Sequence, residues 1–207
     1  IEKTLAVELL MDKSKKCRGL VAYNILLDEY ETIYASNIVL ATGGLGQVYK
    51  YTTNPKVATG DGIALAYRAG AKIQDMEFIQ FHPTALTVDG GLDDTEENRF
   101  LISEALRGEG GRLCHKNREK FMQKYDEKQE LASRDIVTRA IFKEMKEQKT
   151  KNVYLDVSHI DSAKLLKRFP NISNICKLKG VDITKDLIPV SPASHYTMGG
   201  VKTKIDG

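Results

Sequence analysis

The residues that could bind or transform a small molecule fall in four short segments, and the first contains a histidine followed by a proline. In Phe81-His82-Pro83-Thr84, His82 is expected to end an apolar strand, and Pro83 restrains its backbone to an extended form. An imidazole held in this way can donate a hydrogen bond to a carboxylate or carbonyl oxygen. A histidine satisfied by the backbone of a turn is the structural alternative.

The second segment places a carboxylate and a guanidinium on one helical face, just before a glycine-rich loop. Glu104 and Arg107 are three residues apart in Ser103-Glu-Ala-Leu-Arg-Gly-Glu-Gly-Gly111. They could form an ordinary surface ion pair, worth about 0.2–0.5 kcal/mol. They could also relay a proton, if the pair is shielded from bulk water. The sequence leaves both possibilities open.

The third segment carries an arginine at the first turn of a predicted helix, residues 133–148. Arg134 there faces the positive end of the helix dipole, which is unfavourable by a few tenths of a kcal/mol unless an anion lies nearby. A bound carboxylate would supply that anion, and the planar guanidinium suits it. Asp135 is the alternative partner.

The fourth segment is His195-Tyr-Thr-Met-Gly-Gly200, which follows Pro189 and Pro192. Prolines stiffen the approach, and paired glycines let the backbone come close to a ligand beside His195. A structural turn with an incidental histidine remains the alternative.

Composition excludes several classes of partner and cofactor. Lys and Arg number 31 and Asp and Glu 28, so the net charge of +3 indicates no nucleic-acid binding. No apolar run reaches the roughly 18 to 20 residues of a membrane span. The three cysteines lie far apart, which predicts neither a disulfide framework nor a metal site and favours the cytoplasm.

The secondary-structure elements that must position these segments are of two kinds, strands in the first part of the chain and mainly helices in the second. Residues 4–40 alternate like a strand meander, and Ile38–Ala41 is predicted to be a buried central strand that ends in a glycine turn. Beyond Lys72 the pattern is mainly helical, with one strand at 152–157. Helices are predicted at 59–70, 118–125, 133–148, 161–168 and 171–179. We therefore expect an α+β fold with a sheet-based part at 1–75, a mixed part at 76–193 and a return to the first part at 194–207.

Six motifs, in order and spacing, resemble the flavoprotein family of succinate dehydrogenase, fumarate reductase and L-aspartate oxidase. The motifs are Ala41-Thr-Gly-Gly44, Thr59-Gly-Asp-Gly62, Phe81-His-Pro-Thr84, Ser103-Glu-Ala-Leu-Arg-Gly-Glu-Gly110, Leu131-Ala-Ser-Arg-Asp135 and His195-Tyr-Thr-Met-Gly-Gly200. The resemblance covers nearly the whole chain. It implies FAD as cofactor, a flavin-binding α/β domain up to residue 75, and an inserted capping domain that closes over a small dicarboxylate.

The resemblance also assigns expected roles to residues. His82, His195 and Arg134 would contact the dicarboxylate, together with Ser103, at a position where the family usually has threonine. Glu104 and Arg107 match residues associated with proton delivery. The segments that would line the flavin contain Ala41, Thr42, Gly43, Gly44 and Asp61.

Within the family, the chain is most similar to the L-aspartate oxidases. The segments that carry this similarity are Val153–Asp156, Arg168–Pro170, Ile188–Val190 and Pro192–Tyr196. They imply oxidation of L-aspartate to iminoaspartate on the way to quinolinate and NAD. A link to quinolinate synthase stays open. The flavoprotein subunit of a succinate dehydrogenase or fumarate reductase is the alternative, and a non-catalytic dicarboxylate-binding fragment is a third reading.

The two ends indicate an internal piece of a longer protein. The chain starts without methionine at Ile1 and stops just after a glycine-rich turn, at Gly207. The family's glycine-rich FAD fingerprint and a further substrate arginine are not in the sequence. We therefore expect the chain to bind FAD weakly, if at all, and to be inactive alone.

Overall fold

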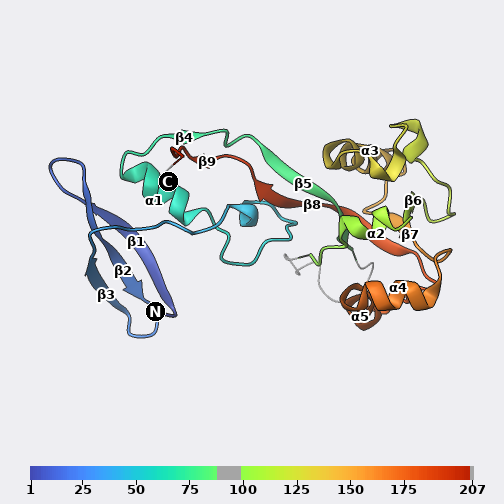
Figure 1. Ribbon diagram of the computed structural model, residues 1–207, viewed down its shortest axis with the longest axis horizontal. Helices are drawn as coiled ribbons and strands as arrows, with labels where there is room; N and C mark the ends of the chain where they lie inside the picture. The colour runs from blue at the N-terminus through green and yellow to red at the C-terminus, as the bar shows by residue number, and fades with distance from the viewer. Residues whose placement is uncertain (88–98, 206–207) are drawn as a thin grey trace. The chain divides into compact units, whose positions relative to one another are not determined.

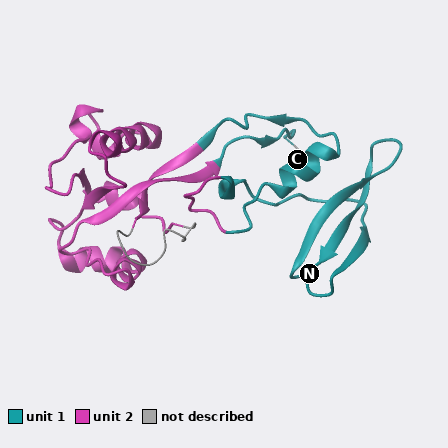
Figure 2. Cartoon of the chain, turned by 180° about the vertical axis from the view of Figure 1, so that it is seen from behind, with its two compact units in different colours: residues 1–48, 56–79, 197–207 teal, residues 49–55, 80–196 magenta. Residues whose placement is uncertain are grey.

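The computed structural model describes residues 1–87 and 99–205, which form two compact units (Figures 1 and 2). The first unit comprises Ile1–Val48, Lys56–Ile79 and Thr197–Gly207. The second comprises Tyr49–Pro55 and Gln80–Tyr196. The sequence-based boundaries place 49–55 and 194–196 in the first part and 76–79 in the second, whereas the contacts group 49–55 and 194–196 with the second unit and 76–79 with the first.

A three-stranded antiparallel meander opens the first unit, as the alternating pattern predicts. Its strands are β1 (Thr4–Met11), β2 (Cys17–Asn24) and β3 (Glu29–Tyr34), in the order β1-β2-β3. The carboxylate of Asp12 accepts hydrogen bonds from the backbone N–H groups of Ser14 and Lys16, so it closes the first turn of the meander.

The predicted central strand at Ile38–Ala41 is wrong. These residues are not in a strand, and the Val39 side chain is 88% exposed. A buried strand needs hydrogen-bonded neighbours on both sides. No such neighbour pairs with this segment in the described part of the chain. The apolar run therefore continues as irregular chain to the 3₁₀ helix η1 (Gly46–Val48).

The rest of the first unit is the helix α1 (Asp61–Arg68) with a two-stranded ladder. The strands β4 (Ile73–Gln74) and β9 (Gly200–Val201) pair antiparallel, so the end of the chain returns to this unit. Gly60 adopts a φ of 83° before the first helical turn, a left-handed conformation that glycine reaches without strain.

The second unit is built on a four-stranded sheet with the order β5-β8-β7-β6. The strands are β5 (Ile79–Leu86), β6 (Arg112–Cys114), β7 (Val153–Asp156) and β8 (Ile188–Thr197). Antiparallel ladders join β6 to β7 and β7 to β8. Hence β8, from the end of the chain, lies between strands that precede it by many residues (Figure 1).

Helices surround this sheet, and their buried faces form its core. The fully buried side chains of Leu113, Phe121, Ile141, Leu155 and Ile188 all belong to one apolar cluster. Among the residues described, no helix is both long and apolar enough to traverse a membrane. The helices are α2 (Glu104–Gly108), η2 (Met122–Lys124), η3 (Gln129–Leu131), α3 (Arg134–Glu147), α4 (Ser162–Arg168) and α5 (Pro170–Leu178).

Most of the predicted helices are confirmed, but the one at 118–125 is wrong. Arg118 has a φ of 66°, which ends any helical run, and His115 N–H donates to the Glu119 carbonyl. These residues form a tight loop, and only Met122–Lys124 is helical, as η2. The amphipathic spacing of this segment reflects the burial of Phe121 and Met122 in a turn.

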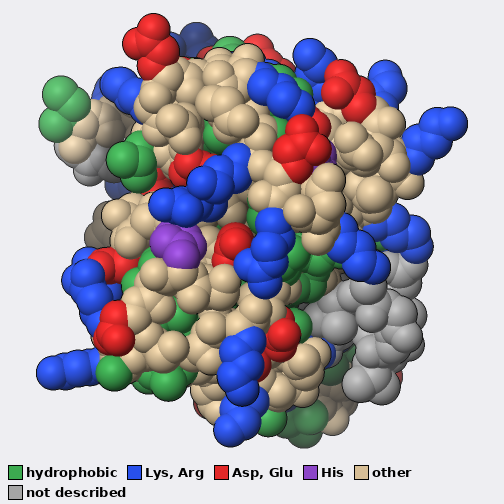
Figure 3. Space-filling model, turned by 90° about the vertical axis from the view of Figure 1, so that its right-hand side faces the viewer, with side chains coloured by type: hydrophobic (Ala, Val, Ile, Leu, Met, Phe, Trp, Pro, Cys, Tyr) green, Lys and Arg blue, Asp and Glu red, His purple; other side chains and the backbone are tan. Residues whose placement is uncertain are grey.

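The distribution of charge agrees with the near-balanced composition. On the face shown in Figure 3, Lys and Arg side chains are spread out and interspersed with Asp and Glu. Such mixing is typical of a solvated surface, and it gives no continuous basic patch on this face.

A close backbone contact after α2 gives a test of this packing. A Cβ added at Gly111 would lie 2.8 Å from the Leu106 carbonyl oxygen, whereas one at Gly108 would meet nothing within 4 Å. Gly111→Ala is expected to destabilise the protein by about 1 to 3 kcal/mol, since the backbone must shift. Gly108→Ala is the matched control and should leave stability nearly unchanged. Urea unfolding of both variants measures the difference, and equal midpoints would contradict the contact.

Candidate functional site

His82 lies within β5 and is fully enclosed. The prediction that it ends the strand is wrong, because β5 continues through Pro83 to Leu86. Proline is tolerated there because β5 is the outer strand in the order β5-β8-β7-β6. The side chain is 1% exposed, and its Nδ1 accepts a hydrogen bond of 3.2 Å from the Thr84 backbone N–H. A nitrogen that accepts from an amide carries no proton, so the proton of the neutral ring is on Nε2.

His195 lies on the neighbouring strand β8, beside His82. The two imidazole centroids are 5.2 Å apart, with ring planes at 72°. The Nδ1 atom of His195 is 2.7 Å from the hydroxyl oxygen of Thr53. The pairing of β5 with β8 thus brings together two histidines from the first and fourth sequence segments.

Both imidazoles are held in the neutral form. The pKa of His82 is lowered to about 3, mainly by burial and, to a smaller extent, by electrostatic repulsion from His195, Arg107 and Arg134. Burial is also the main cause of the lowered pKa of His195, with a smaller effect of Arg134. A neutral imidazole offers one N–H donor without a positive charge. The two rings are therefore hydrogen-bond donors rather than cations at neutral pH.

Arg134 begins α3, as expected, and an anion does face it. Its Nε donates 2.7 Å to a carboxylate oxygen of Glu104, and its Nη1 donates 2.8 Å to the side-chain oxygen of Gln80. The alternative partner, Asp135, pairs with Arg139 instead. The unfavourable dipole position of Arg134 is thus offset by Glu104, which comes from α2.

Arg107 is a buried cation with unused hydrogen-bond donors. It is 1% exposed, and its Nη1 donates 2.6 Å to the Glu130 carbonyl. Its Nε and Nη2 have no hydrogen-bond partner among the described residues, and Nη2 is 4.0 Å from the Glu104 carboxylate. Burial lowers the pKa of this guanidinium, and Glu104 opposes that shift. Arg107 and Glu104 are therefore not an ordinary surface pair.

Glu104 connects the two arginines. Hydrogen bonding to Arg134 lowers the pKa of its carboxyl, with a further contribution from the charge of Arg107. With this lowered pKa the carboxyl group is ionised. Its side chain is 49% exposed and therefore reaches water. Ser103 lies next to it at the N-terminus of α2 and makes no side-chain capping bond to that helix. The hydroxyl of Ser103 therefore does not cap α2.

The residues expected to line the flavin lie in the first unit. Thr42 packs against the start of α1 so closely that a Cβ on Gly62 would overlap its hydroxyl, and the Gly44 carbonyl accepts from Gly60 N–H. Ala41, Thr42 and Gly43 are exposed, and Gly43 has a φ of 70° with open space around it. This backbone is open to a ligand, and the Asp61 carboxylate, which accepts a hydrogen bond from the Thr59 hydroxyl, lies in the first turn of α1.

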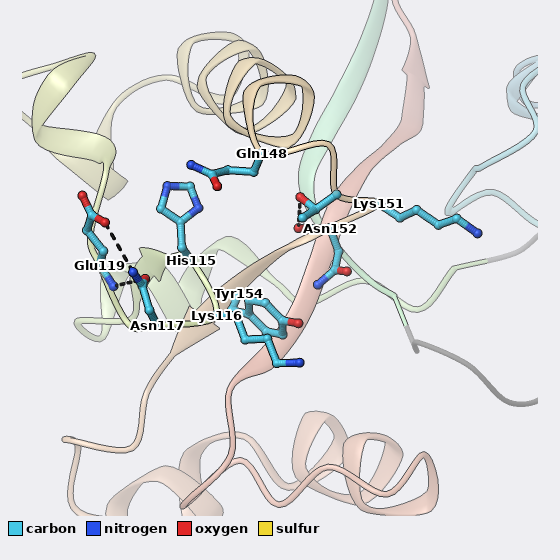
Figure 4. A pocket seen from close by; sticks show the side chains of 9 residues that line it. His115, Lys116, Asn117, Glu119, Gln148, Lys151, Asn152 and Tyr154 are labelled. Carbon is cyan, nitrogen blue, oxygen red and sulfur yellow. Dashed lines mark hydrogen bonds between the residues drawn. The ribbon is translucent and has the colours of Figure 1, made fainter.

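A cavity in the second unit is lined by none of the residues predicted for the site. It has a volume of about 480 Å³ and lies between the end of α3 and the loop after β6 (Figure 4). Its lining residues are His115, Lys116, Asn117, Glu119, Gln148, Thr150, Lys151, Asn152 and Tyr154. No cluster of metal-ligating side chains is found among the described residues.

Three residues that contact the candidate site were not anticipated. Gln80 lies two positions before His82 and so faces the same side of β5, a spacing that could have revealed it. Thr53 and Glu130 reach His195 and Arg107 from distant segments, and no local pattern marks them.

Comparison with known proteins identifies the family of this chain. The family model described as "FAD binding domain" matches residues 1–207, and the chain belongs to this family. FAD is accordingly the cofactor. The fold is a mixture of helix and sheet, as expected.

Curated relatives carry the name L-aspartate oxidase. The chloroplastic enzyme of Arabidopsis thaliana is 47% identical over 208 residues, covering 98% of this chain and 32% of the relative. L-aspartate oxidase 1 of Ralstonia nicotianae is 49% identical, covering 98% of this chain and 38% of the relative. The chain thus spans about a third of the length of the curated relatives it matches.

Solved structures of related flavoproteins have the same fold. A variant of E. coli quinol fumarate reductase FrdA superposes with a TM-score of 0.83 at 37% identity, covering 97% of this chain and 36% of that one. Mycobacterium smegmatis Sdh1 gives a TM-score of 0.76 at 36% identity, covering 97% of this chain and 33% of that one.

The protonation state of His82 can be tested by titration. Its folded pKa of about 3 lies below the usual value near 6.5, so protonation favours the unfolded chain. Stability is then retained above pH 6.5 and falls as the pH is lowered from there towards 3. We expect the ¹⁵N shifts of His82 to stay those of a neutral ring from pH 8 to pH 5 in the folded protein. The urea-unfolded chain, as control, should titrate near 6.5, and a folded midpoint near that value would contradict the burial effect.

Proposed function

We propose that the protein containing this chain is an FAD-dependent oxidase of L-aspartate, which it converts to iminoaspartate for NAD biosynthesis by way of quinolinate. The observation that carries the proposal is the convergence of His82, His195 and Arg134 in one unit. Two neutral N–H donors and a guanidinium match the oxygens of a small dicarboxylate. The names of the curated relatives support L-aspartate as the member of that class.

Arg134 acts in this proposal as clamp and charge stabiliser. A guanidinium is protonated at all ordinary pH values, which makes it a poor base and a good partner for a carboxylate. Its Nε and Nη1 are oriented by Glu104 and Gln80. The histidines add uncharged hydrogen-bond donors. The carboxylate oxygens are therefore bound by one guanidinium and two neutral rings rather than by three cations. Ser103 adds a hydroxyl at the edge of this group.

Glu104 is the group that we assign to proton transfer. Oxidation of the Cα–N bond removes a hydride from Cα and a proton from nitrogen, and FAD supplies the hydride acceptor when it is bound. Glu104 is ionised, half exposed and 2.7 Å from Arg134, so it can pass a proton between the site and water. The hydrogen bond from Arg134 and, to a smaller extent, the charge of Arg107 lower the pKa of that carboxyl and keep it ionised.

The family resemblance suggests a separate role for each of the two units. We propose that the first unit contributes Ala41–Gly44 and Asp61 to the flavin site, as part of a flavin-binding α/β domain, and that the second unit is the capping domain. The three cysteines are free, in keeping with the proposed cytoplasmic setting.

Fumarate reductase or succinate dehydrogenase flavoproteins are the second candidate, favoured by the TM-score of 0.83 to the E. coli enzyme. The experiment that decides is turnover of the full-length protein, loaded with FAD, on L-aspartate and on succinate. Oxidation of aspartate without partner subunits supports the oxidase. Activity on succinate or fumarate alone would replace it with the second candidate.

The clamp is tested by replacing Arg134 with lysine in the full-length protein. Arg134→Lys keeps the charge and loses the planar fork, so kcat/KM for L-aspartate should fall on the order of 100-fold. Arg139→Lys is the matched control, because Arg139 lies on the same helix and pairs with Asp135 at the surface. Steady-state kinetics of both variants provide the measurement. Turnover largely intact in Arg134→Lys would exclude the clamp.

The 207-residue chain alone is expected to be inactive. Its apolar segment at Ile38–Leu40 is unpaired in the described part of the chain, and the relatives are about three times as long. We expect the purified chain to bind FAD weakly and to leave aspartate unoxidised, as followed by flavin absorbance and peroxide release. A yellow protein of this length that turns over aspartate would overturn this expectation.

A further inference from the structure

The short segment Tyr51–Asn54 runs along the end of β8, beside His195. Ser194 N–H donates 2.9 Å to the Tyr51 carbonyl, and Thr53 N–H donates 2.9 Å to the Ser194 carbonyl. The side-chain amide of Asn54 donates 2.7 Å to the His195 carbonyl. These bonds fix the backbone of His195, and they leave its ring to be fixed by another contact.

That contact is the hydroxyl of Thr53, whose oxygen is 2.7 Å from Nδ1 of His195. A hydroxyl has one proton, and two acceptors compete for it. The Ser194 carbonyl already accepts from Thr53 N–H at 2.9 Å and from the Thr52 hydroxyl at 3.0 Å, which occupies both of its lone pairs. The Thr53 hydroxyl is 3.4 Å from that carbonyl, a longer contact. The proton is therefore directed to Nδ1 of His195.

We propose that Thr53 is a positioning residue, which holds His195 as the tautomer with its proton on Nε2 and so presents an N–H donor to the dicarboxylate. In a neutral ring, a proton on Nε2 requires Nδ1 to be an acceptor, and Thr53 supplies the matching donor. The inference rests on the proposed dicarboxylate site.

The same arrangement at His82 supports this reading. There the Nδ1 atom accepts from the Thr84 backbone N–H, a group that can only donate. The two neighbouring rings thus have one pattern, with Nδ1 occupied by a threonine donor and Nε2 carrying the proton. At His195 the donor is a side chain, so this half of the pattern can be removed by substitution without altering the backbone.

The test uses the FAD-loaded full-length protein, with ¹⁵N-labelled histidine and with succinate as probe. Thr53→Val removes the hydroxyl and keeps the shape of the side chain, whereas Thr53→Ser keeps the hydroxyl. Thr150→Val is the matched control, since the Thr150 hydroxyl likewise donates to a backbone carbonyl, that of Asn152, and does not touch His195, Thr53 or Ser194. Side-chain ¹⁵N shifts report the tautomer of His195, and calorimetry reports the affinity for succinate. Neither readout needs turnover, so failure to oxidise aspartate would remove the proposed oxidase and leave this inference standing.

We expect wild-type His195 to carry its proton on Nε2. Thr53→Val should lose that preference and bind succinate about tenfold more weakly, the scale of one lost hydrogen bond. Thr53→Ser should restore both properties, and Thr150→Val should keep the wild-type ¹⁵N pattern. A proton on Nδ1 in the wild type, an unchanged tautomer in Thr53→Val, or the same shift in Thr150→Val would each overturn the inference. Because the wild type and Thr53→Ser are informative alone, poor folding of Thr53→Val leaves a decisive measurement.

Discussion

The candidate site depends on the pairing of β5 with β8. These strands come from distant parts of the chain, and their adjacency sets the imidazoles of His82 and His195 at 5.2 Å. The burial that follows from this pairing is what lowers the pKa of both rings. With the rings uncharged, the positive charge of the site is left to Arg107 and Arg134, and Glu104 balances part of it.

Local sequence patterns predicted the elements that are stabilised by features of their own sequence. The helices α1, α3, α4 and α5 and the strand β7 have their own apolar stripes, caps or glycine stops, as with Asp161 at the start of α4. The two wrong elements lacked tertiary support for the predicted form. Ile38–Ala41 has the composition of a central strand, but pairing decides whether such a run becomes one. Residues 118–125 bury Phe121 and Met122 from a loop.

The residues of the candidate site were marked in the sequence for a related reason. His82, Arg134 and His195 stand beside glycine, proline or a helix start, so type and context both mark them. Gln80 is marked only by its spacing from His82 along β5. Thr53 and Glu130 act through contacts that join segments remote in sequence, and they look like ordinary polar residues in their local context. Asp135, the partner that local spacing suggested for Arg134, instead serves Arg139.

Every side chain expected to touch the dicarboxylate belongs to the second unit, while those expected along the flavin belong to the first. Selection can therefore act on substrate preference and on redox chemistry through separate sets of residues. In the proposed enzyme, an exchange within β5, α2 or the start of α3 is expected to change substrate preference and to leave the flavin site unchanged. Such modularity is a physical basis on which one ancestral flavoprotein could diversify into enzymes for different small acids. It also makes the second unit the natural place to redesign specificity.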